Sequence, residues 1–61
     1  MAQSTRFLRL PEVKRLTGLG KSTIYVRMAE GSFPRQISLG PRLVVWSEQQ
    51  IHQWMEEQMA A

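Results

Sequence analysis

The stretch from Leu16 to Gly31, LTGLGKSTIYVRMAEG, constrains the fold more than any other part of the sequence. Gly18 follows a short apolar-periodic segment, as glycine does just after a helix C-terminus, and Gly31 closes a second such segment in the same way. Gly18 and Gly20 leave only a short turn between the two segments. Two helices joined by a short glycine-containing turn form a helix-turn-helix. We therefore expect the rest of the chain to support this unit or to extend its surface.

The first helix is predicted over Pro11–Thr17. Pro11 suits the first turn of a helix, where its missing N–H costs nothing. Val13 and Leu16 are three residues apart, so they share one apolar face. We expect both side chains to be buried.

The second helix is predicted to start at Lys21 and to end before Gly31. Gly20 is an acceptable N-cap, although it offers no side-chain acceptor. At roughly 100° per residue, Ile24 and Met28 point in the same direction. These two side chains are expected to anchor the helix to the core.

The other side of the second helix carries side chains suited to nucleic acid. Hydroxyl groups and an arginine can contact phosphates or base edges, and an exposed valine can meet a thymine methyl group. The outward residues are expected to be Ser22, Thr23, Val26 and Arg27. Lys21 lies at the helix N-terminus, where backbone N–H groups favour a phosphate. Tyr25 lies at the edge, with its ring in the core or its hydroxyl at a phosphate; a plain solvated helix face is the alternative for the whole set.

Beyond Phe33 the sequence alternates between apolar and polar residues, which favours strands. Two short strands are predicted over Arg35–Leu39 and Arg42–Trp46, around a turn at Gly40-Pro41. The inward-facing residues are expected to be Ile37, Leu39, Val44 and Trp46. A basic hairpin after a helix-turn-helix is a wing, which can follow the DNA backbone or enter the minor groove. Arg35 and Arg42 are its candidate contacts, and a plain stabilising hairpin with exposed charges is the alternative.

The last helix is predicted to begin at Ser47. Ser47 and Gln50 have the spacing of a capping box. Ile51, Trp54 and Met55 form its apolar stripe. We expect this helix, acidic on its outer side, to pack over the hairpin and to avoid DNA.

The charge is unevenly distributed along the chain. The formal net charge is +3, but residues 1–46 hold all eight basic residues with two glutamates, a net charge of +6. Residues 47–61 hold three glutamates and no base, a net charge of −3. A basic surface favours a polyanion, and such attraction to DNA falls steeply with salt. An ordinary solvated surface is the alternative.

Sixty-one residues suffice for one small domain. We expect it to span residues 6–61, with residues 1–5 disordered. There is no cysteine, which fits a reducing cytoplasm. The longest apolar run, Leu43–Trp46, is far shorter than the roughly 20 residues that span a bilayer, and no signal peptide is evident. We therefore predict a cytoplasmic protein without a membrane partner.

The sequence offers no set of catalytic residues. Gly20-Lys21-Ser22-Thr23 resembles the end of a phosphate-binding P-loop, but that motif needs a glycine where Arg15 stands, and the chain has no aspartate. His52 is the single histidine and lies among polar residues of a helix. We predict no enzymatic activity, no metal, no cofactor and no small-molecule ligand.

Several short motifs, taken in order and with their spacing, resemble the AlpA family of prophage regulatory proteins. That family lies within the winged-helix group that includes MerR-like regulators and phage excisionases. The similarity covers about Arg6 to Gln58. Its motifs are Leu8-Arg9-Leu10-Pro11-Glu12-Val13, Leu16-Thr17-Gly18-Leu19, Lys21-Ser22-Thr23-Ile24-Tyr25, Glu30-Gly31 with Phe33-Pro34, Leu39-Gly40 with Arg42, Trp46, and Ile51 with Trp54.

The resemblance implies an α+β fold: a small winged helix-turn-helix domain with two N-terminal helices, a two-stranded hairpin wing and a C-terminal helix. It also implies a regulator of integrase or excision functions that binds double-stranded DNA on the nucleoid, with the second helix in the major groove and the wing at the minor groove. Three residues depart from the family pattern: Gly20 replaces a common serine N-cap, Arg27 an apolar residue, and Ser38 a basic one.

Two other functions are consistent with the same residues. An excisionase that bends DNA would use the same surface, and a protein-interaction module would make no DNA contact. Single DNA-binding modules bury only roughly 600–1,000 Å² of surface on DNA, so we expect a homodimer or cooperative binding to tandem sites.

Overall fold

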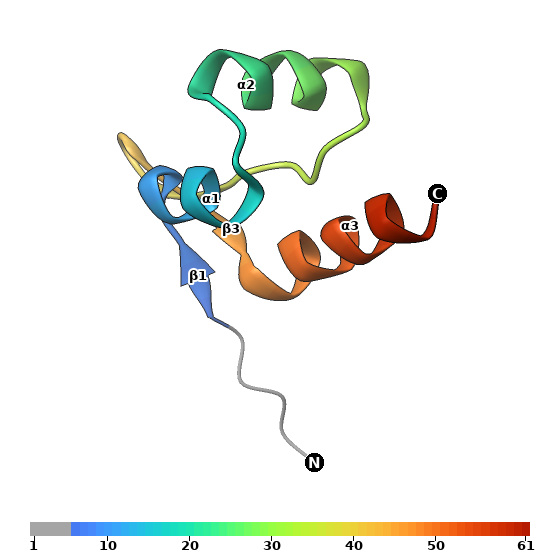
Figure 1. The fold of residues 1–61 in the computed structure, drawn as a ribbon. Coiled ribbons are helices and arrows are strands. Elements are labelled where there is room, and N and C mark those ends of the chain that lie inside the picture. The colour runs from blue at the N-terminus through green and yellow to red at the C-terminus, as the bar shows by residue number, and fades with distance from the viewer. Residues whose placement is uncertain (1–5) are drawn as a thin grey trace.

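The computed structural model describes residues 6–61, and the expectation of disorder for residues 1–5 lies outside this range. In chain order the elements are β1 (Phe7–Leu8), α1 (Leu10–Thr17), α2 (Lys21–Glu30), β2 (Ile37–Gly40), β3 (Leu43–Ser47) and α3 (Glu48–Ala60) (Figure 1). This is the predicted α+β winged helix-turn-helix, with its two N-terminal helices, hairpin and final helix. Within the described residues, no helix is long and apolar enough to cross a membrane.

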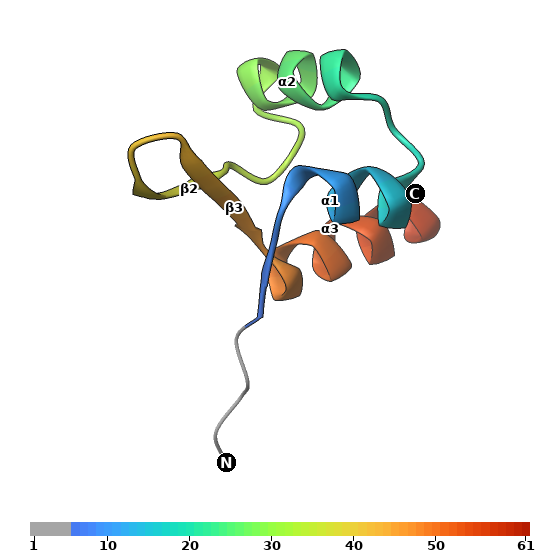
Figure 2. The ribbon, with the colours of Figure 1, turned by 90° about the vertical axis from the view of Figure 1, so that its left-hand side faces the viewer.

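The sheet has three antiparallel strands in the order β1-β3-β2, one more than the predicted hairpin. The additional strand, β1, pairs Phe7 with Ser47 and Leu8 with Trp46. On the other side of β3, Ile37 pairs with Val45. Figure 2 shows the β2–β3 hairpin projecting to one side of the three helices. Each predicted hairpin strand was placed one or two residues too early.

The helix ends follow from local sequence. Gly18 and Gly31 cap α1 and α2 with φ angles of 74° and 79°, in the left-handed region that glycine adopts at little cost. Gly20 is the N-cap of α2 and makes no side-chain hydrogen bond, as predicted. The hydroxyl of Ser47 accepts a hydrogen bond from the backbone N–H of Gln50, so Ser47 caps α3.

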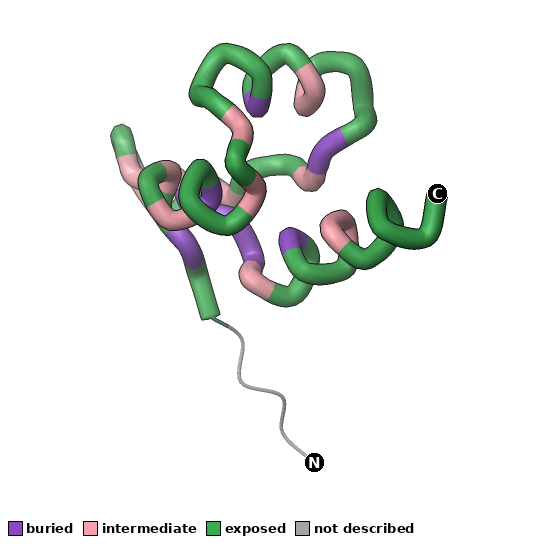
Figure 3. Tube along the Cα trace, in the orientation of Figure 1, coloured by how far each residue is buried: buried purple, intermediate pink, exposed green. Residues whose placement is uncertain are grey.

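The core lies between the inner face of the sheet and the three helices (Figure 3). Trp46, on the central strand, is its largest fully buried side chain. Burying each such side chain contributes about 1.5–3 kcal/mol. The core consists of Leu8, Val13, Ile24, Phe33, Trp46 and Ile51. The partly buried residues that pack against it are Leu10, Leu19, Met28, Trp54 and Met55.

Two residues predicted to face the core are exposed. Leu16 is 41% exposed. The face of α1 that packs inward carries Leu10, Val13 and Thr17, and Leu16 lies outside this face. Leu39 is 49% exposed, because it lies on edge strand β2 beside an irregularity in the pairing.

Strand β3 also departs from the predicted alternation. Trp46 is buried as predicted, but Val44 is only half-buried, and Val45, which was not predicted to face inward, is buried as well. Strand β3 is the central strand of the sheet, so it has no free edge. Trp54, expected in the core, is partly buried.

Candidate nucleic-acid interface

Helix α2 lies at one end of the molecule (Figures 1 and 2). Helices α1 and α3 both lie on its inner side, so its opposite side faces solvent. Ile24 is fully buried and Met28 packs partly against the core, as predicted, so one side of the helix is anchored. The exposed side carries Lys21, Ser22, Thr23 and Val26, and Val26 is 55% exposed. The structure therefore presents these four residues together on a protruding helix.

Arg27 does not lie fully on the outward face where it was predicted; it is half-buried. It follows Ile24 by three residues and so lies only about 60° from it around the helix axis. A half-buried arginine covers apolar surface with its stem while its charged end reaches solvent. Between residues 6 and 61 the guanidinium has no hydrogen bond or ion pair. The guanidinium can therefore contact a partner molecule, but the Arg27 side chain leaves the helix at the edge of the exposed face.

Tyr25 lies on the other edge of this face, 36% exposed. Its hydroxyl donates a hydrogen bond to Gln36 Oε1 at 3.3 Å. The ring is therefore not a core residue, and the hydroxyl is linked to the segment that follows α2. No motif or spacing in the sequence singled out Gln36, because this contact joins two segments eleven positions apart.

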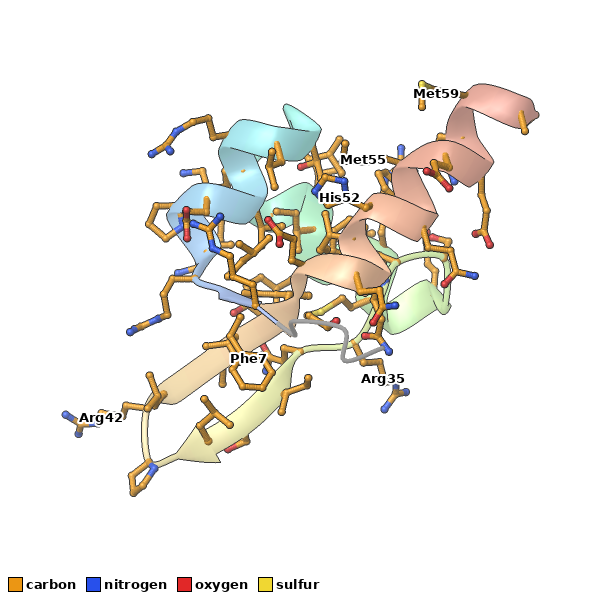
Figure 4. All side chains as sticks on the ribbon, turned by 90° about the horizontal axis from the view of Figure 1, so that it is seen from below. Phe7, Arg35, Arg42, His52, Met55 and Met59 are labelled. Carbon is orange, nitrogen blue, oxygen red and sulfur yellow. The ribbon has the colours of Figure 1, made fainter. Side chains whose placement is uncertain are left out.

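Arg35 precedes β2 instead of opening it, because the strand begins at Ile37. It is exposed and lines a shallow hollow of about 430 Å³ beside α2. Figure 4 shows Arg35 and Arg42 far apart, with Arg35 near the end of the segment that leaves α2 and Arg42 at the hairpin turn. Both arginines were predicted to be contacts of the wing, but only Arg42 lies in the hairpin.

Arg42 occupies the β2–β3 turn with a φ angle of 60°. A left-handed backbone at a long side chain is uncommon and costs on the order of 1–3 kcal/mol. The side chain is exposed at the tip of the hairpin (Figure 4). Ser38, where the family pattern often has a base, donates its hydroxyl to the Gly40 carbonyl within the same hairpin. Arg42 is thus a solvent-exposed cation at the tip of the β2–β3 hairpin.

Most of the basic side chains form no ion pair within the part of the chain that the structure describes. Arg6 is the exception: its guanidinium lies 3.1 Å from Glu12 Oε2 and 3.4 Å from Glu48 Oε2. Over residues 6–61 the other seven basic side chains form no ion pair. These seven are Arg9, Lys14, Arg15, Lys21, Arg27, Arg35 and Arg42. A surface with so many cations and so few ion pairs suits a polyanion.

A second hollow, of about 780 Å³, lies between the segment after α2 and helix α3. Beside it, the rings of Phe33 and Trp54 pack edge to face, with their centroids 4.8 Å apart, and Trp54 Nε1 donates to the Ser32 carbonyl at 2.8 Å.

The exposed His52 lies 3.9 Å from Glu48. In the described part of the chain, no three His, Cys, Asp or Glu residues are grouped to hold a metal ion.

Residues 6–59 match the family model described as the prophage CP4-57 regulatory protein (AlpA). The chain belongs to the AlpA family. It is 33% identical over 60 residues to the DNA-binding transcriptional activator AlpA of Escherichia coli (strain K12), covering 88% of this chain and 86% of that protein. It is also 47% identical over 55 residues to the uncharacterized protein ORF88 of Enterobacteria phage P4, covering 90% of this chain.

The chain spans 62% of the length of that phage P4 protein. The AlpA family match includes every candidate contact residue from Lys21 to Arg42 and all of the helices and strands except the end of α3. The AlpA resemblance inferred from short motifs is therefore confirmed.

Proposed function

We propose that this chain is a sequence-specific double-stranded DNA-binding protein that regulates transcription in a prophage or integrative element, at the level of integrase or excision control. The observation that carries the proposal is the protruding α2, which is anchored by Ile24 and bears Lys21 and Arg27, two cations that form no ion pair within residues 6–61. The name of the Escherichia coli relative, a DNA-binding transcriptional activator, supports it.

In this proposal α2 enters the major groove and the hairpin lies at the minor groove. Lys21 holds a phosphate at the helix N-terminus, where the backbone N–H groups already favour an anion. Ser22, Thr23 and Val26 face base edges, which specify sequence, and Arg27 reaches a base from the edge of the helix. The remaining contacts are Tyr25, Arg35 and Arg42.

The protein acts in the cytoplasm on nucleoid DNA, without a cofactor and without catalysis. One copy of so small a domain offers a limited contact surface, and so a homodimer or cooperative binding at tandem sites is expected.

The proposal is tested by footprinting on the integrase promoter and attachment region of the element that carries the gene. We expect protection of a defined site, with a repeat spacing that reports the number of bound copies. Affinity for that site should fall steeply between roughly 50 and 200 mM salt, through counterion release. A random duplex that binds as tightly as the protected site across the series would rule out sequence-specific recognition.

The same DNA distinguishes the other two functions. An excisionase would bend the attachment region and increase excision in a recombination assay with integrase. A protein-interaction module would bind none of these duplexes at low salt, and Arg27→Ala and Arg35→Ala would then change nothing.

A further inference from the structure

Tyr25, Arg35 and Gln36 meet at the shallow hollow between α2 and the segment that leads into β2. The hollow is lined by these three residues together with Met28 and Ala29, so no carboxylate of residues 6–61 lines it. All three polar side chains are exposed, and the Tyr25 hydroxyl lies 3.3 Å from Gln36 Oε1. The arrangement thus combines a cation, an amide and a phenol on one open surface.

The direction of the Tyr25–Gln36 hydrogen bond decides which groups are left over. The phenol donates and the amide oxygen accepts, which orients the Gln36 side chain and turns its NH₂ group away from the ring. Within the described residues, neither that NH₂ group nor the Arg35 guanidinium forms a hydrogen bond or an ion pair. The hollow therefore presents unused donors and one positive charge, and no competing anion.

We propose that Gln36, Tyr25 and Arg35 form one DNA-phosphate site, in which Gln36 is a contact residue. Arg35 supplies the charge, the Gln36 NH₂ group donates to a phosphate oxygen, and Tyr25 holds the amide in the orientation that makes this possible. The site rests on the proposed DNA-binding function. It makes Arg35 a partner of helix α2 rather than of the hairpin. A shallow open hollow suits a diester of a DNA strand passing over it, because a free phosphate needs a more enclosing set of donors.

The test uses the full chain and a short mixed-sequence DNA duplex, since a phosphate contact does not depend on base sequence. Binding is measured by fluorescence anisotropy over roughly 50–200 mM salt. Gln36→Ala should weaken binding about tenfold, as expected for a hydrogen bond to a charged group, without changing the salt slope. Arg35→Ala should also weaken binding and lower the slope by about 0.9, the value for one phosphate neutralised.

The decisive measurement is the coupling between these variants. In the Arg35→Ala background, Gln36→Ala should change affinity much less than in the wild type, because the phosphate is no longer held there. Tyr25→Phe, which keeps the ring, should reproduce part of the Gln36→Ala loss. Gln58→Ala, the same substitution at an exposed glutamine of α3, should leave binding unchanged. Thermal unfolding of each variant separates these effects from loss of the fold.

Two results would overturn the phosphate site while leaving the proposed function intact: a wild type that binds the duplex but shows no loss with Gln36→Ala, or fully additive losses in the double variant. Saturable binding of inorganic phosphate that disappears in Arg35→Ala would instead assign the hollow to a free anion. A wild type that at low salt binds neither this duplex nor the integrase promoter and attachment region would overturn the DNA-binding proposal itself.

Discussion

The guanidinium of Arg6 lies 3.1 Å from the carboxylate of Glu12, and its other terminal nitrogen lies 3.4 Å from Glu48. The Arg6 carbonyl also accepts a hydrogen bond from the backbone N–H of Glu48 at 2.8 Å. One residue thus joins the start of β1 to the first turns of α1 and α3. Its charge serves the fold, whereas the other basic residues form no ion pair within residues 6–61.

Arg6→Ala should therefore affect stability more than DNA binding. Both ion pairs are partly exposed, so together they are worth about 1 kcal/mol or less after screening by solvent and salt. Urea unfolding gives the change in free energy, and it should shrink at high salt. Arg42→Ala is the matched control, because Arg42 forms no ion pair with any described residue, so its removal should reduce DNA affinity more than stability. The opposite ranking of the two variants in affinity would contradict this division of roles.

Val13→Ala and Leu16→Ala compare two apolar residues of the same helix. Val13 is completely buried and its truncation should cost about 1–3 kcal/mol, from lost burial and the cavity left behind. Leu16 is 41% exposed, and its truncation should cost less than about 1 kcal/mol. Calorimetry should show a shift of roughly 4–8 °C in Tm for each kcal/mol in a domain of this size. Equal shifts for the two variants would mean that Leu16 is packed as tightly as Val13.

Lys21→Ala and Arg27→Ala separate a phosphate contact from a base contact on α2. Lys21→Ala should weaken all sequences alike and lower the salt slope by about 0.9. Arg27→Ala should relax preference at one base position, with a loss of about 1–3 kcal/mol on the preferred site only. Selection from a randomised duplex library, repeated with each variant, distinguishes the two patterns. An unchanged preference with Arg27→Ala would show that the half-buried side chain does not reach a base.

Arg42→Gly should change stability and binding in opposite directions. Glycine adopts the φ angle of 60° at this turn without the strain that arginine carries, so the fold should gain up to about 1 kcal/mol. Removal of the charge should at the same time weaken DNA binding and flatten its salt dependence. Arg42→Asn keeps a residue tolerant of this backbone and serves as the control for loss of charge alone. A glycine variant that is less stable than the asparagine one would argue against strain at the turn.

The positions of the helices followed from signals that act within a few residues. Gly18 and Gly31 end α1 and α2 because the left-handed backbone is cheap for glycine, and Ser47 starts α3 because its hydroxyl is within reach of the Gln50 N–H. The alternation beyond Phe33 likewise predicted a hairpin, to within one or two residues. Local chemistry of this kind is visible in the sequence because both partners are near neighbours along the chain.

The candidate site was predictable in its centre and not at its edges. Lys21, Ser22, Thr23 and Val26 are exposed as expected, since they lie away from Ile24 on the helix wheel. Arg27 lies close enough to Ile24 around the helix for packing to cover part of it, so its exposure depended on how the helix was seated. Arg35 and Arg42 looked alike in sequence, and only the start of β2 at Ile37 separated them.

What the sequence by itself determined is therefore the family, the order of the helices and hairpin, and the identity of the protruding helix. Only the tertiary structure decided that Phe7–Leu8 adds a third strand, that Arg6 joins three elements, that Leu16 is exposed, and that Gln36 meets Tyr25. The physical reason is distance along the chain. A cap or a turn is set by adjacent residues, whereas a two-residue strand or a contact between helix and loop exists only once the core has brought remote segments together.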